Sequence, residues 1–404
     1  MKKINGGVCA AAGSKAAGIH CGIRKNQSKR DLGLIVSDCE ASAAAVYTSN
    51  LVKGAPLLVT KEHLANGKAR AILCNSGNAN TCNADGPAVA RAMCKLAGDA
   101  LGIAPEDVAV ASTGVIGQPL SLAPIAAGME PLVEDLGYEN SLHAAQAIMT
   151  TDTVPKEAAV EFELGGVTCR LGGIAKGSGM IHPNMATTLV FITTDAAISS
   201  QMLQKALSTD VQNTFNMVSI DGDTSTNDMV VILANGKAGN APITAESQDF
   251  VTFMKALNTV AIALCRMLAG DGEGATRLLE CRVTGAADLA CARTVAKTVI
   301  CSSLVKAAMF GADANWGRVL CAIGYSGADV DVNKVDVAFA SGAGRVEVCR
   351  AGAGVPFSEE TAKQILLEKE VEIQVELNAG GAESTAWGCD LTYDYVKING
   401  DYRT

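Results

Sequence analysis

Short apolar runs alternate with amphipathic stretches of helical length along this chain, and that alternation limits the folds it can adopt. Residues 189–192 and 229–233 are apolar and rich in β-branched side chains, which is typical of buried strands. Residues 251–268 repeat apolar side chains at helical spacing and stop at Gly270. The mixture predicts a layered α/β chain of α+β type with antiparallel pairing, and not a doubly wound Rossmann sheet.

Alternating apolar side chains late in the chain predict a hairpin. Residues 335–339 and 346–348 alternate, and a Gly-Ala-Gly turn at 342–344 joins them. We expect these strands to belong to a smaller C-terminal α/β part at roughly residues 280–390. The other expected elements are a helix over 88–101, a helix capped by Ser141, a short helix near 365–367, strands over 371–377 and 387–391, and a last strand ending with Val396 and Ile398.

The 404 residues suffice for two domains, and composition narrows what they do. Aromatic residues make up only 4% of the chain beside 41 glycines, so the core must be built from small aliphatic side chains packed against backbone. A net charge of −9, with no basic run longer than two residues, excludes a nucleic-acid surface. The sequence has no run of about 18 apolar residues, so no membrane span is predicted. No signal-peptide core is predicted at the start either.

Cysteine and histidine spacing predicts neither disulfides nor a metal site. The fourteen cysteines form no Cys-x-x-Cys pair, and the four histidines have no ligand spacing. We expect free thiols in a reducing cytoplasm and no metal. Three other motifs fail: Gly177-Ser178-Gly179 lacks the third dinucleotide-loop glycine, Asp221–Asp228 is a polar loop with Thr226 where a calcium loop needs glycine, and Ser303 to Lys306 is a surface helix turn.

The segment from Ala175 to Leu189 places a glycine-rich turn and a proline ahead of a threonine that opens a strand. A self-processing enzyme needs such a hydroxyl beside a strained peptide bond. After cleavage the threonine would also carry a free α-amine, whose pKa near 8 suits a base at neutral pH. The residues alone leave open an ordinary turn that enters a strand.

The run Pro183-Asn184-Met185-Ala186 ahead of Thr187 resembles the cleavage site of the glutamate N-acetyltransferase and ornithine acetyltransferase family of arginine biosynthesis. His182 and Thr188 differ from the commonest family residues at these positions, and neither carries a role in the implied chemistry. Similar blocks follow in family order at residues 16–19, 75–80, 111–117, 150–153, 221–228, 270–276, 311–318 and 399–404.

The resemblance implies a self-cleaving acetyltransferase fold with sheets packed between helices. It implies a cut between Ala186 and Thr187 that leaves an α chain of residues 1–186 and a β chain of residues 187–404. The two fragments would stay associated as a heterotetramer of two α and two β chains.

The resemblance also assigns roles. Thr187 is the nucleophile, while Thr113 and Gly114 form the oxyanion hole. A plain turn remains the alternative interpretation of Thr113 and Gly114. Lys176, Thr153, Glu273, Asn399, Thr404 and Thr187 itself hold the substrate. Alternatives remain for three of them: Lys176 as a solvated loop charge, Thr153 as a helix-terminus cap and Glu273 as a cap of its glycine-rich loop.

The implied reaction is ping-pong and needs no cofactor. Thr187 takes acetyl from N-acetylornithine, releases ornithine and passes the acetyl group to glutamate. Bifunctional relatives also accept acetyl-CoA, and the sequence does not decide whether this chain does. Two alternatives stay open: a self-cleaving aminopeptidase-like hydrolase, in which water takes the acyl group, and an uncleaved scaffold.

Overall fold

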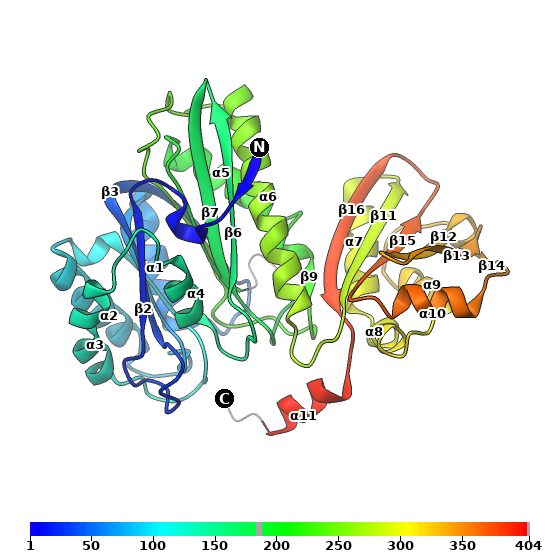
Figure 1. Cartoon of the computed structure of the whole chain (residues 1–404), viewed down its shortest axis with the longest axis horizontal. Helices are drawn as coiled ribbons and strands as arrows, with labels where there is room; N and C mark the ends of the chain where they lie inside the picture. The colour runs from blue at the N-terminus through cyan, green and yellow to red at the C-terminus, as the bar shows by residue number, and fades with distance from the viewer. Residues whose placement is uncertain (183–187, 402–404) are drawn as a thin grey trace.

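The computed structural model describes residues 1–182 and 188–401, which form two lobes (Figure 1). The first lobe is built on a nine-stranded sheet, and α11 leaves the second lobe to lie beside the first. In order across the first sheet lie β1 (Lys2–Ile4), β6 (Lys156–Leu164), β7 (Val167–Lys176), β8 (Leu189–Thr194), β10 (Met229–Ala234), β3 (Leu32–Tyr47), β4 (Lys68–Asn75) and β5 (Val108–Ser112), with β2 (Ser14–Ile19) paired to β3.

The second lobe holds a seven-stranded sheet to which β9 contributes from the middle of the chain. Its order is β14 (Ala353–Gly354), β13 (Gly344–Arg350), β12 (Asp336–Ser341), β15 (Glu370–Glu376), β11 (Leu278–Ala286), β16 (Ala382–Cys389) and β9 (Val218–Ser219). The helices are α1 (Ala55–His63), α2 (Gly86–Leu101), α3 (Leu122–Glu134), α4 (Ser141–Ile148), α5 (Ser200–Asp210), α6 (Gln248–Gly270), α7 (Leu289–Cys301), α8 (Ser303–Phe310), α9 (Trp316–Gly324), α10 (Glu359–Leu366) and α11 (Tyr393–Asp401). Short 3-10 turns occupy Gly7–Cys9, Leu64–Asn66, Pro105–Asp107, Phe215–Met217 and Val332–Lys334.

The central strands β8 and β10 explain why two apolar runs lack alternation. They pair in parallel, and both of their faces are covered. Val190 and Ile192 pack with α5 and α6 on one face, whereas Leu189 and Phe191 pack toward α4 on the other. A strand buried on both faces reads as a continuous apolar run. The layered α/β prediction, with sheets packed between helices, is confirmed.

Helix α6 runs from the first lobe to the second and packs on β6, β7 and β16. Among the described residues it is the one helix long and apolar enough to cross a membrane. Its Phe253, Leu257 and Leu264 are fully buried against the two sheets. Because its apolar face packs inside the protein, α6 has the character of a core helix.

Most of the expected elements are present, and four local expectations are wrong. Ser141 does not cap α4 but is its first residue, and its Oγ accepts a hydrogen bond from Val8 N. Lys306 is not on the surface, because its Nζ donates to the Cys389 carbonyl and its side chain is buried. The strand expected over 387–391 ends at Cys389. Val396 and Ile398 belong to helix α11 and not to a strand.

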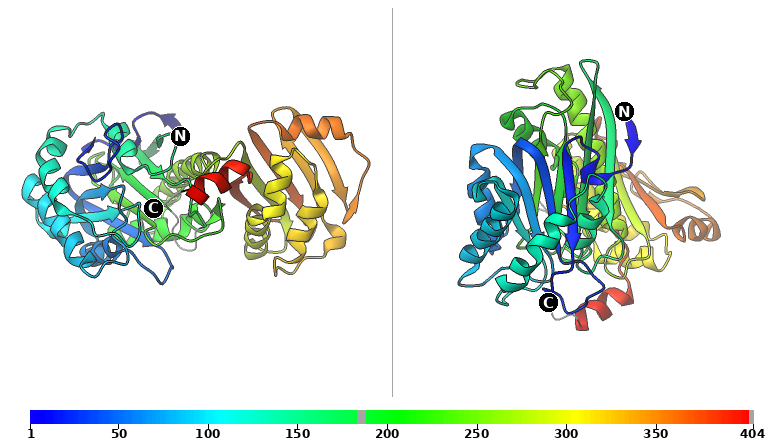
Figure 2. Two further views of the ribbon diagram at one scale, coloured as in Figure 1. Left: turned by 90° about the horizontal axis from the view of Figure 1, so that it is seen from below. Right: turned by 60° about the vertical axis from the view of Figure 1, so that its left-hand side comes forward.

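The last correction has a physical reason. Two apolar residues two positions apart fit a strand, but so short a window cannot exclude a helix. In α11 the inward contacts instead come from Tyr395 and Asn399, which lie four residues apart on one helical face. Figures 1 and 2 together show α11 below the junction of the two lobes.

Candidate active site

A small pocket of about 180 Å3 lies where loops of the first lobe meet the end of α6 and helix α11. It gathers five of the residues predicted for the site from parts of the chain that are far apart in sequence. Its lining is Ala79, Thr113, Gly114, Ile116, Thr150, Thr151, Lys176, Gly179, Met180, Ser225, Thr226, Asn227, Glu273 and Asn399.

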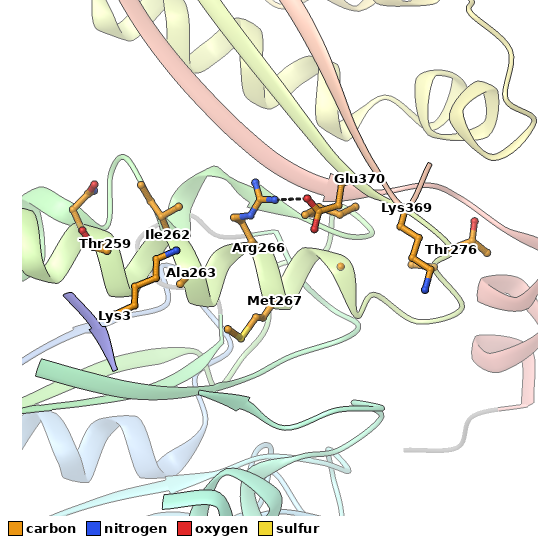
Figure 3. Close-up of a pocket in the computed structure, with 13 residues that line it drawn as sticks. Lys3, Thr259, Ile262, Ala263, Arg266, Met267, Thr276, Lys369 and Glu370 are labelled. Atoms are coloured by element: carbon orange, nitrogen blue, oxygen red, sulfur yellow. Dashed lines mark hydrogen bonds and ion pairs between the residues drawn. The ribbon is translucent and has the colours of Figure 1, made fainter. Parts of the chain in front are cut away.

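A larger groove of about 750 Å3 runs along the outer face of α6 (Figure 3). Lys3, Arg266, Met267, Lys369 and Glu370 line part of it, and Arg266 and Glu370 are paired with each other. None of the predicted site residues that the structure describes lines this groove. Its size alone therefore does not make it the active site.

Thr113 and Gly114 follow β5 in a turn that leaves room only for glycine. Gly114 has a φ of 128°, and a Cβ there would lie 2.4 Å from the carbonyl carbon of Gly77. Thr113 N donates to Asn75 O at 3.0 Å, so the end of β4 holds the turn in place. Thr113 and Gly114 thus line the same pocket, as the two residues of an oxyanion hole must.

Lys176 ends β7 with its side chain nearly buried, so it is not a solvated loop charge. Its Nζ donates to Thr113 Oγ1 at 3.3 Å. Because that oxygen accepts a bond from the ammonium, its own hydrogen is free to point into the pocket. Lys176 therefore places a positive charge beside the proposed oxyanion hole.

Glu273 lies in the glycine-rich loop after α6 and is 8% exposed. Its N–H donates to Ser178 O at 2.8 Å, and its Oε2 accepts from Asn399 Nδ2 at 2.8 Å. A Cβ at Gly179 would lie 2.5 Å from the Glu273 carboxyl carbon, so a larger residue there would have to displace the carboxylate. Lys176 and Glu273 place opposite charges in one small pocket, which suits a substrate that carries both a carboxylate and an amine.

Thr153 does not line the pocket. It is exposed, and its Oγ1 donates to Asp271 Oδ1. Thr150 and Thr151, from the same block of residues, line the pocket in its place. Helix α4 ends at Ile148, so Thr153 is not a helix-terminus cap either.

Asn227 is a site residue that sequence reasoning missed. Its Nδ2 donates to Ala79 O at 2.6 Å and to Ser112 O at 2.9 Å, and its Oδ1 accepts from Thr81 Oγ1 at 2.6 Å. It thereby ties the segment just before β10 to the loop after β4 and to the end of β5, where the Thr113 turn begins. The polarity of residues 221–228 was visible in the sequence, but this set of partners was not.

Beside Asn227, burial raises the pKa of Asp228 to about 8, more than its contacts with Ser225 and the charge of Lys176 lower it. Its carboxyl group is therefore largely neutral at pH 7 and adds little negative charge near the pocket. No cluster of three or more potential metal-ligating side chains occurs in the part of the chain that the structure describes. All fourteen cysteines are free thiols, as predicted.

Three predicted residues lie outside the described residues. They are Ala186 and Thr187 at the predicted cleavage site and Thr404 at the end of the chain. Glu273 and Asn399 are described and meet at the pocket, which brings the loop after α6 against α11.

Comparison with known proteins identifies relatives along the whole chain. The profile of the ArgJ family matches residues 15–404. The arginine biosynthesis bifunctional protein ArgJ of Symbiobacterium thermophilum is 52% identical, with 100% of each chain covered. The protein named ArgJ 1 of Clostridium acetobutylicum is 50% identical, with 96% of each chain covered. A crystal structure of the bifunctional ArgJ protein of Bacillus halodurans is 49% identical at a TM-score of 0.50, and the match covers 52% of this chain and 98% of that chain.

Proposed function

This chain belongs to the ArgJ family and is an acetyltransferase of arginine biosynthesis, and from that premise we propose that it cuts itself between Ala186 and Thr187 and carries acetyl on Thr187. The acetyl group passes from N-acetylornithine to glutamate, which yields ornithine and N-acetylglutamate. The observation that supports this function best is the pocket that gathers Thr113, Gly114, Lys176 and Glu273.

Self-cleavage proceeds in two steps. Thr187 Oγ attacks the Ala186 carbonyl and displaces the Thr187 nitrogen, so the amide becomes an ester. Water then cleaves that ester, leaving a carboxylate on Ala186 and a free α-amine on Thr187. This amine, with a pKa near 8, accepts the hydroxyl proton in each later attack.

Acetyl transfer uses the same hydroxyl. Thr187 Oγ attacks the acetyl carbonyl of N-acetylornithine, and the developing oxyanion accepts hydrogen bonds from the Thr113 hydroxyl and the Gly114 N–H. The amide nitrogen leaves as the protonated amine of ornithine. The amine of glutamate then attacks the acetyl ester, and Thr187 regains its hydroxyl proton as N-acetylglutamate leaves.

Four further features belong to the proposal. The relatives are named bifunctional, so we propose acetyl-CoA as a second donor, to be tested by coenzyme A release in the presence of glutamate alone. No other cofactor takes part. The fourteen free cysteines support a cytoplasmic location. The two fragments assemble as two α and two β chains, which native mass spectrometry tests.

Purified protein is expected to consist of two fragments, residues 1–186 and 187–404. The match of the Bacillus halodurans chain to only about half of this chain is consistent with a cut near the middle. Denaturing mass spectrometry with N-terminal sequencing should find Thr187 at the start of the second fragment. Active enzyme that contains only full-length chain would contradict self-cleavage, and release of free acetate at an equal rate without glutamate would indicate a hydrolase.

Truncation after Ile398 is expected to lower kcat/KM for N-acetylornithine at least roughly tenfold, about 1.4 kcal/mol of transition-state binding. The reason is that Asn399 Nδ2 holds Glu273 Oε2 at 2.8 Å, and the cut removes this contact. Initial-rate kinetics measure the loss, and mass spectrometry should still find cleavage before Thr187. Lys397→Ala, at an exposed position of the same helix, is the control and should keep full activity. Unchanged kcat/KM after truncation would show that Asn399 does not serve the site.

A further inference from the structure

A fully buried lysine joins two aspartates behind the pocket. Lys156, the first residue of β6, is 0% exposed. Its Nζ lies 2.7 Å from Asp152 Oδ1 and 2.6 Å from Asp271 Oδ2. None of these three residues lines the pocket. Buried charges are costly unless they are paired, so an arrangement of this kind needs an explanation.

The two aspartates hold the backbone of the segments that carry the substrate-facing residues. Asp152 accepts from Thr150 N at 2.9 Å and from Gly177 N, directly after Lys176, at 2.7 Å. Asp271 accepts from Thr153 N and from its hydroxyl. Lys156 therefore connects the segment of Thr150 and Thr151 with the end of β7 and the loop after α6.

A second connection fixes the position of Glu273 relative to Lys176. Ser178, two residues after Lys176, donates from Oγ to the Asp271 carbonyl at 2.6 Å. The Ser178 carbonyl in turn accepts from Glu273 N at 2.8 Å. The distance between Lys176 and Glu273 thus depends on how closely Asp271 is held to Asp152, and Lys156 bridges those two carboxylates.

Electrostatics agree with this geometry. One ammonium between two carboxylates leaves one net negative charge, which Lys176 offsets from the pocket side. Burial alone would raise the pKa of Asp152, but attraction to Lys156 and then to Lys176 outweighs it and lowers the pKa to about 2. Asp152 therefore stays ionised throughout the range in which the enzyme would work.

We propose that Lys156 is a positioning residue that sets the separation of Lys176 and Glu273, and so determines how tightly the amino-acid part of the substrate is bound. This inference rests on the proposed function. Lys156 acts through Asp152 and Asp271, without touching the substrate. Thr153 belongs to the same network although it lies outside the pocket, because its hydroxyl donates to Asp271.

The first test is Lys156→Met, which removes the charge and keeps a long side chain. We expect the KM for N-acetylornithine and the Kd of ornithine, measured by calorimetry, to rise together by at least roughly tenfold, since small misplacements in a site are costly. Lys95→Met is the matched control, because Lys95 also pairs with an aspartate four residues away, Asp99, but on the surface. That variant should match the unmodified enzyme.

The second test is pH, which distinguishes positioning from a general loss of stability. The charged groups facing the two carboxylates are Lys156 and Lys176, with Glu273 two residues beyond Asp271. Without Lys156, the carboxylates can share one proton, so the pKa of one of them rises. Where one carboxyl group is protonated, this proton can replace the ammonium as the bridge, whereas at higher pH both groups are ionised and repel each other.

Ornithine binding by Lys156→Met, relative to the unmodified enzyme, should therefore weaken as the pH rises and the shared proton is lost. The double variant Lys156→Met/Asp152→Asn removes the repulsion and should fold even where the single variant does not. Its Kd should stay raised, and its relative binding should no longer depend on pH.

The outcomes separate the inference from the function on which it rests. Unmodified enzyme without acetyl transfer would overturn the proposed function. Active unmodified enzyme together with a folded Lys156 variant of unchanged Kd and KM would overturn the positioning role. A variant that only melts at a lower temperature, with unchanged Kd, would show that Lys156 is purely structural. If only the double variant folds, a Kd for ornithine equal to that of the unmodified enzyme would overturn the inference.

Discussion

Replacement of Thr187 by alanine is expected to abolish both self-cleavage and acetyl transfer. Both reactions use the same Oγ, first on the Ala186 carbonyl and then on the acetyl carbonyl. Removing the nucleophile of a covalent mechanism costs on the order of a millionfold in kcat. Mass spectrometry of the purified variant should find a single chain of 404 residues, and assays of ornithine release should fall to background.

Thr188→Val is the matched control for this variant. Thr188 is buried, and within the described part of the chain its Oγ1 has no hydrogen-bond partner. Valine has nearly the same shape, so cleavage and activity should persist. A Thr187→Ala protein that still appears as two fragments would place the nucleophile elsewhere, and loss of cleavage in both variants would mean that the strand start, and not the Thr187 hydroxyl, is responsible.

Thr113→Ala is expected to lower kcat by roughly 100- to 1000-fold with little change in KM. A hydrogen bond that forms only to the developing oxyanion lowers the barrier without holding the ground state. Thr113 Oγ1 already accepts from Lys176 Nζ at 3.3 Å, which leaves the hydroxyl hydrogen free to donate to an oxyanion. Steady-state kinetics with N-acetylornithine and glutamate measure the two parameters separately.

Thr113→Ser keeps the hydroxyl and loses only a methyl group, so it should retain most of the activity. If Thr113→Ala instead raised KM and left kcat intact, Thr113 would bind the substrate and would not stabilise the transition state. Glu273 lies on another segment of the pocket lining, and its contact with Asn399 does not involve Thr113. The effects of Thr113→Ala and of the C-terminal truncation should therefore be close to additive.

Local patterns in the chain were enough to predict the elements with the strongest signals. The apolar runs at β8 and β10, the helical spacing of α6 and the alternation of β12 and β13 all appear as expected. Such signals are local, because the apolar pattern of a buried strand or an amphipathic helix is visible within roughly ten to twenty residues. The family blocks likewise predicted that Thr113, Lys176, Glu273 and Asn399 serve one site, and they meet at one pocket.

Contacts between distant residues were decided only by the tertiary structure. Lys156 and Asp271 are 115 positions apart, and Asn399 and Glu273 are 126 apart, so no local period relates them. The same reason explains the errors. Lys306 is buried because Cys389 accepts its bond, and Thr153 turns to Asp271 while Thr150 and Thr151 face the pocket. Spacing along a chain specifies which face a side chain occupies, but packing decides what lies opposite that face.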